Sequence, residues 1–202
     1  MTALQAPSYA VTYYFNGTLL QAFSTYNQGT PFAGSFSYEY PQATNIFQGP
    51  MVAPVGNYIG STATFSIGTE QVSLTNLGNY TNIAIYNNNS FSMFGHEDAF
   101  YISFGGSASL GGRPNFALEL LLVDDNGNAL NSLGLVGDSM RLNQFNTAIL
   151  RIAVQGDWDS QTNMYRSLYI QNELTALAPE PSSLSLLVLG GVIVACRRRK
   201  KE

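Results

Sequence analysis

Alternating polar and apolar residues recur along most of the chain, and this alternation predicts β-strands. Within residues 35–40, Phe36, Tyr38 and Tyr40 share one face, because successive side chains of an extended chain point to opposite sides. Clusters of glycine, asparagine and proline separate such segments and indicate turns. The same alternation marks six further candidate strands, at residues 11–15, 62–67, 83–86, 100–104, 148–154 and 165–174.

The last two of these segments also predict which side chains face a core. The charged Arg151 is expected to point outward, since its neighbours on both sides are aliphatic. The residues expected to face inward are Ala148, Leu150, Ile152 and Val154 in one segment and Leu168, Ile170 and Leu174 in the other.

Residues 116–123 (FALELLLV) break the alternation, because apolar residues occur on both phases. Eight residues are few for a helix, and turn signals flank the run on both sides. We therefore expect a strand buried on both faces. Together, the short strands and frequent turns predict an all-β protein whose body, residues 8–178, is a two-sheet β-sandwich of the jelly-roll type.

Composition agrees with this fold class and excludes others. Charged residues make up 11% of the 202 residues, too few for a coiled coil or a helical bundle, and 24 Phe and Tyr residues argue against a disordered chain. Residues 1–178 carry eleven acidic and four basic side chains, whereas residues 179–202 carry two acidic and five basic ones. An acidic body that contains no lysine has no electrostatic footprint for nucleic acid.

The last two dozen residues consist of three parts in a fixed order. Pro179, Glu180 and Pro181 are expected to end the preceding strand, residues 184–196 carry no charge, and five basic residues follow. A helix over residues 184–196 would be about 20 Å long, shorter than a hydrocarbon core of about 30 Å, so it spans a bilayer only if the bilayer thins and the basic side chains snorkel. The alternative is a C-terminal core helix with a solvated basic end. The apolar side chains of the expected helix include Leu184, Leu186, Leu187, Val188, Leu189, Val192, Ile193 and Val194.

This order of parts resembles the PEP-CTERM sorting domain of bacterial surface proteins. The resemblance implies recognition by an exosortase, a membrane protease-transpeptidase, followed by processing near the PEP motif and delivery to the cell surface or the exopolysaccharide matrix. It also implies that Pro179, Glu180 and Pro181 form the recognition motif and that the apolar run is a transient membrane anchor. The residues implied to stop transfer on the cytoplasmic side are Arg197, Arg198, Arg199, Lys200 and Lys201.

Export requires a leader, and residues 1–7 are expected to be the end of one. Residues 3–6 (ALQA) resemble the small-residue end of a signal-peptide cleavage site, just before the first expected strand. The hypothesis is that Met1 is an internal residue of a longer signal peptide. The single cysteine, Cys196, allows no disulfide within the chain and no cysteine-based metal site.

The strongest candidate for ligand binding is the only tryptophan, Trp158, between Asp157 and Asp159. An indole beside carboxylates suits a sugar, which stacks on the ring and hydrogen-bonds to the oxygens, or a calcium ion.

Other acidic groups give weaker signals. The sequence at 124–128 (DDNGN) offers oxygen ligands of the calcium type but does not fit an EF-hand loop, so a turn is the favoured interpretation. Residues 96–98 (HED) contain the only histidine and also read as a polar turn. A glycoside hydrolase would need a pair of carboxylates, and the glutamates that could supply one are Glu39, Glu70, Glu97, Glu119 and Glu173.

The sequence thus predicts an exported surface or matrix protein without a cofactor or metal, whose body acts as a structural or interaction module and not as an enzyme. Its expected partners are an exosortase, the membrane and exopolysaccharide. A lectin-like carbohydrate-binding module and a glycan-active hydrolase remain the alternatives.

Overall fold

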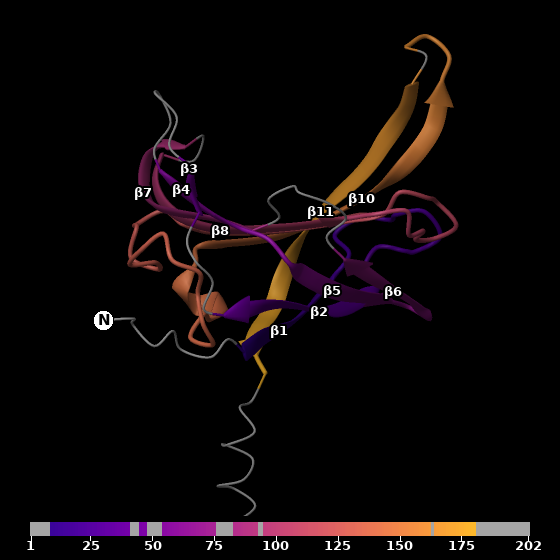
Figure 1. Cartoon of the computed structure of the whole chain (residues 1–202). Coiled ribbons are helices and arrows are strands. Elements are labelled where there is room, and N and C mark those ends of the chain that lie inside the picture. Colours follow the sequence, from indigo (N-terminus) through magenta and orange to yellow (C-terminus); the bar gives the residue numbers. More distant parts are fainter. Residues whose placement is uncertain are drawn as a thin grey trace, which may run out of the picture.

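The fold is all-β, and all eleven strands of the described residues belong to one curled antiparallel sheet (Figure 1). The computed structural model describes residues 9–40, 45–47, 54–75, 83–92, 95–162 and 164–180. The strands are β1 (Tyr9–Thr18), β2 (Pro31–Tyr40), β3 (Asn45–Phe47), β4 (Val55–Tyr58), β5 (Ser61–Ile67), β6 (Glu70–Thr75), β7 (Ile83–Ser92), β8 (Gly95–Gly105), β9 (Ala117–Asp124), β10 (Thr147–Asp159) and β11 (Met164–Pro179).

The strand order is β3-β4-β7-β8-β9-β10-β11-β1-β2-β5-β6, so the two separate sheets of a sandwich are replaced by one continuous sheet. The reason lies in β11, which is 16 residues long. Its first part pairs with β10 as far as Glu173, and its second part, from Leu174 onward, pairs with β1. One strand therefore belongs to both halves and joins them.

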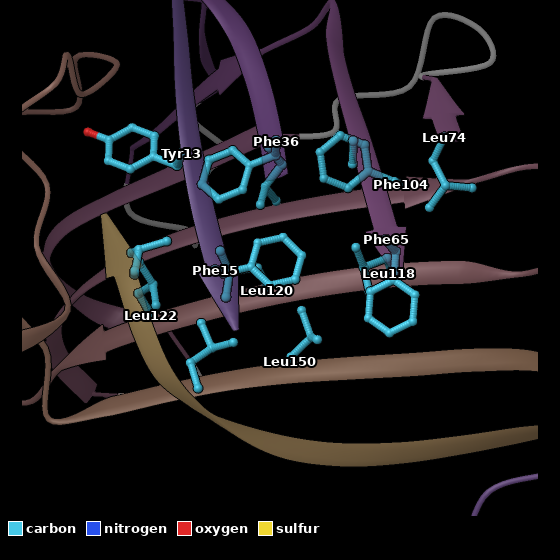
Figure 2. Close-up of a cluster of buried hydrophobic side chains, with 14 of the residues drawn as sticks. Tyr13, Phe15, Phe36, Phe65, Leu74, Phe104, Leu118, Leu120, Leu122 and Leu150 are labelled. Carbon is cyan, nitrogen blue, oxygen red and sulfur yellow. The ribbon is translucent and has the colours of Figure 1, made fainter. Parts of the chain in front are cut away.

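The core lies between the inward faces of these two halves. Figure 2 shows Tyr13, Phe15 and Phe36 from one half above the leucines of β9 and β10 from the other. Phe36 contacts Phe100 across the core with ring centroids 6.1 Å apart, and Phe65 contacts Phe116 at 5.5 Å. The curled sheet thus buries the apolar inner faces of its two halves against each other, and such burial is the main favourable contribution to folding.

Most of the strands expected from alternation are confirmed, together with their inward faces. Phe36, Tyr38 and Ile152 are buried as predicted, and Arg151 faces outward. Leu118 and the run Leu120–Val123 are buried, which confirms β9 as a strand with both faces covered. The strand β11 ends at Pro179, and the Glu180 N–H still donates to the Thr12 carbonyl at 2.8 Å.

One expected core residue is placed wrongly by the sequence pattern. Leu168 shares a strand face with the buried Ile170 and Leu174, but it is exposed. The reason is that β10 and β11 continue beyond the end of β9, which pairs with β10 only as far as Ala153. Val154, the cross-strand partner of Leu168, is still buried, but the β11 side of this extension is exposed from Met164 to Arg166 and at Leu168.

A long connection between β9 and β10, residues 125–146, closes one end of the core. Three tyrosines hold it through hydrogen bonds from their hydroxyl groups to backbone carbonyls: Tyr58 to Leu133 at 2.7 Å, Tyr38 to Val136 at 2.7 Å, and Tyr13 to Gly137. Tyr13 also accepts a hydrogen bond from the Met140 N–H at 3.1 Å. Burial raises the pKa of Tyr13 to about 12, so its hydroxyl stays protonated and keeps donating even in alkaline solution.

The expected leader remnant 1–7, Pro181, the helix over 184–196 and the basic residues 197–201 lie outside the described residues. Among the residues that are described, no helix has the length and apolar character needed to cross a bilayer.

Candidate functional site

The two longest strands project from the sheet as a two-stranded hairpin, here called the arm and defined as residues 153–169 (Figure 1). Beyond Ala153, β10 has lost its partner β9, and only β11 pairs with it. The Gln155 N–H, however, donates to the Pro114 carbonyl at 2.9 Å, so the connection between β8 and β9 supports the base of the arm. The arm is therefore a protruding element fixed at its base.

A β-bulge sets the direction of the side chains near the tip of the arm. The register shifts between Gln155 and Trp158, where β10 has one residue more than β11. Gly156 sits inside this bulge, and a Cβ atom there would lie 2.6 Å from the Arg166 carbonyl oxygen. Only glycine fits, and the bulge it allows places Trp158 opposite Tyr165.

Three aromatic side chains lie on the outer face of the arm, the face turned away from the core. Trp158 is 51% exposed and Tyr165 is 58% exposed; their rings meet edge to face with centroids 4.9 Å apart. Tyr169 is 69% exposed, and it shares the face of Tyr165 because the two are four residues apart on β11. These three residues are called the aromatic platform.

The two carboxylates beside Trp158 are each held by an arginine. Asp157 accepts a hydrogen bond from Arg113 at 3.2 Å, and Asp159 accepts two from Arg166 at 2.9 and 3.1 Å. The Gln161 N–H and Arg166 lower the pKa of Asp159. The two carboxylates thus brace the arm through separate arginines. Within the described part of the chain, no group of three or more His, Cys, Asp or Glu side chains is arranged to hold a metal ion.

Two hollows adjoin the arm. One, of about 390 Å³, lies on the outer face and is lined by Glu119, Arg151, Ala153, Tyr169 and Gln171. The other, of about 660 Å³, lies at the base of the arm, where the edge of Tyr165 meets the polar loops around Ser24 and Gly111. A third hollow, of about 460 Å³, lies away from the platform, where β10 and β11 separate.

The acidic residues around 97–125 fix the connection that closes the core. Asp124 accepts backbone hydrogen bonds from Asn126, Asn128 and Ala129 at 3.2, 2.8 and 3.0 Å. Asp98, its direct cross-strand partner, accepts one from Leu130 at 2.7 Å. Among the oxygens that the sequence offered to calcium, those of Asp124 are therefore used as anchors for backbone N–H groups.

Burial disfavours ionisation of two acids of this region, yet their pKa values shift in opposite directions. It opposes ionisation of Asp124, but the N–H donors of Asn128, Asn126 and Ala129 together outweigh it and lower the pKa of that carboxyl. Burial, with the negative charge of Asp125, raises the pKa of Glu97. The side chain of His96 lies outside the described structure.

The glutamates considered for hydrolysis lie on separate strands. Glu70 accepts a hydrogen bond from the Gly111 N–H at 2.8 Å, and Glu119 forms an ion pair with Arg151 at 3.8 Å. Glu39 is exposed on β2, and Glu173 is exposed on β11. These placements give both Glu70 and Glu119 a structural partner.

Sequence reasoning found Trp158 but missed Tyr165 and Tyr169 as members of the same site. The signal was present: both tyrosines occupy the strand phase opposite to Ile170 and Leu174. Aromatic residues on the outward phase of a strand whose other phase is aliphatic are candidates for contact with a ligand.

The chain was compared with protein-family models, curated proteins and solved structures. No family model, no curated protein and no solved structure matches the chain.

Proposed function

We propose that this chain is an exported bacterial cell-surface or matrix protein, and that its body is a non-catalytic interaction module. The observation that carries the proposal is the order of parts after the body: a PEP motif, an apolar run expected to be a helix, and a basic end. The position of Pro179 supports it, because the folded sheet ends inside the motif. A membrane exosortase would read the motif, the run 184–196 would be the transient anchor, and the body would be the cargo.

Processing of the tail is the first expected result. Mass analysis of the C-terminus of protein released from cells should find that everything beyond the PEP region has been lost. Glu180→Ala should leave the chain full-length in the membrane fraction, whereas Glu39→Ala, which changes an exposed carboxylate far along the chain, should be processed normally. Full-length protein dissolved in the cytosol would contradict both the proposed export to the cell surface and the proposed function of the body there.

A second function, carbohydrate binding at the tip of the arm, is favoured by one specific observation. The only tryptophan of the chain is half-exposed on a protruding hairpin and is held edge to face by Tyr165. Exposed aromatic rings with polar neighbours suit sugars, since the apolar face of a sugar ring stacks on the aromatic face while its hydroxyl groups bond to polar groups nearby.

Trp158→Ala should abolish retention of the full-length chain on a glycan array without altering its thermal unfolding, because the side chain contributes little to the core. Ile59→Ala is the matched control, since Ile59 is exposed to a similar extent, 56%, in the turn between β4 and β5. Equal binding by both variants would exclude Trp158 as the contact, and absence of binding to every glycan would exclude the function.

A further inference from the structure

We propose that the outer face of β10 and β11 binds a neutral, linear polysaccharide that lies lengthwise along the arm. This inference rests on the carbohydrate-binding function proposed above and extends it from a single ring to a series of sugar units. Tyr165 and Tyr169 are four residues apart on one strand, which is about 13 Å. A single terminal sugar reaches one of these rings, whereas a chain is needed to cover Trp158, Tyr165 and Tyr169 together.

The strand register continues this surface beyond the aromatic platform. Going along the outer face from the tip, Trp158 stands opposite Tyr165, Ala153 opposite Tyr169, and Arg151 opposite Gln171. The small side chain of Ala153 leaves room beside the Tyr169 ring, and the hollow of about 390 Å³ opens there. The amide of Gln171, the guanidinium of Arg151 and the carboxylate of Glu119 line this hollow and offer both donors and acceptors for sugar hydroxyls.

The charges along the arm favour a neutral ligand over an acidic one. Each arginine on or beside the outer face already has a carboxylate partner: Arg113 with Asp157, Arg151 with Glu119, and Arg166 with Asp159. The body as a whole is acidic. No described cation on this face is left to attract a uronic acid or a phosphate, and the field of the body repels both.

The same surface is poorly suited to a second protein chain. The core of a protein–protein interface is apolar and depleted in charge. On the arm, polar groups interrupt the aromatic surface between the Trp158–Tyr165 pair and Tyr169: Gln155 lies between Trp158 and Ala153 on β10, and an ion pair flanks Tyr169. A sugar chain, which alternates apolar ring faces with hydroxyl groups, matches this alternation.

The test uses the full-length chain in native affinity gels containing a neutral polymer (hydroxyethylcellulose, galactomannan or dextran) or the acidic polymer alginate. We expect at least one neutral polymer to retard the protein and Tyr169→Ala to weaken that retardation about tenfold, the loss typical of a buried aromatic contact. Tyr14→Ala is the control: it removes a tyrosine that is 49% exposed on the outer side of β1, and it should leave retardation unchanged. Retardation should also be insensitive to salt.

Oligosaccharide titration supplies a second readout, because emission from the only tryptophan reports on the site alone. For the retarding polymer, six-unit fragments should bind at least tenfold more tightly than two-unit fragments, and Tyr169→Ala should remove most of that difference. If, in the affinity gels, Trp158→Ala abolishes retardation while Tyr169→Ala does not change it, the extended site is rejected and the single-ring site stands. Tighter binding to alginate, retardation by none of the neutral polymers, or self-association lost in Tyr169→Ala would overturn the proposal.

Discussion

Phe36→Ala is expected to lower the free energy of unfolding by about 3–5 kcal/mol, the range for removing a large buried aromatic ring. Phe36 is almost fully buried and stacks on Tyr13 with centroids 5.4 Å apart. It also contacts Phe100 on the opposite half of the sheet. The cavity would therefore open in the contact that holds the two halves together. Chemical denaturation followed by circular dichroism measures the change.

Two further variants test whether the loss of stability comes from the buried position of Phe36 and not simply from removing an aromatic side chain. Phe36→Leu keeps much of the volume and should cost clearly less than Phe36→Ala. Tyr14→Ala removes an aromatic side chain from the exposed face of the neighbouring strand and should change the free energy of unfolding by less than about 1 kcal/mol. A Phe36→Ala loss no larger than that of Tyr14→Ala would show that the two halves do not depend on this contact.

Asp124→Ala is expected to cost about 2–4 kcal/mol of stability, because it leaves several N–H donors at the start of the core-closing connection without their acceptor. The donors are those of Asn126, Asn128 and Ala129. Asp124→Asn keeps one acceptor oxygen and should lose less. Denaturant unfolding at neutral pH measures both, and a loss within error for Asp124→Ala would mean that the connection is held by the tyrosines alone.

The effect of Asp124 should also depend on pH, with a definite sign. Because the pKa of Asp124 is lower in the folded state than its ordinary value of 3.8, its contribution is complete above that value and is lost as the pH falls through the folded-state pKa. The difference between wild type and Asp124→Ala should therefore shrink in acid. Glu97, whose pKa is raised, acts in the opposite direction, so the comparison of variants and not the whole-protein curve isolates Asp124.

Local alternation was enough to predict most of the strands, because a strand buried on one face carries a period of two in its own residues. Phe36, Phe65 and Ile152 illustrate this, and all three are buried. The single sheet could not be predicted in the same way, since it depends on a change of partner at Glu173 and Leu174 from β10 to β1. The pairing partner of Glu173 lies about 25 positions earlier in the chain, and that of Leu174 lies more than 150 positions earlier. The residues around Glu173 carry no local signal of this change.

In the candidate site, too, features set by local sequence could be predicted and features set by distant residues could not. Trp158 could be singled out from the sequence because it is the only tryptophan. Its exposure could not, because it depends on β10 extending beyond the end of β9. The role of Asp157 could not be read from its neighbours, because its partner Arg113 lies 44 residues earlier in the chain. The hydrogen bonds between the tyrosines and the connection 125–146 could not be predicted either, because their partners are far apart in the sequence. Tyr13 and Met140, for example, are 127 residues apart.

The length of β11 has a consequence for a protein attached by its tail. The strand begins at Met164 beside the aromatic platform and ends at Pro179, where the tail starts. Its sixteen residues extend over at most about 53 Å, and the beginning of β1 lies at the tail end, since Tyr13 pairs with Pro179. A chain tethered to an envelope through its C-terminus would thus use one strand as a built-in spacer, which keeps the tip clear of the attachment surface without a flexible stalk.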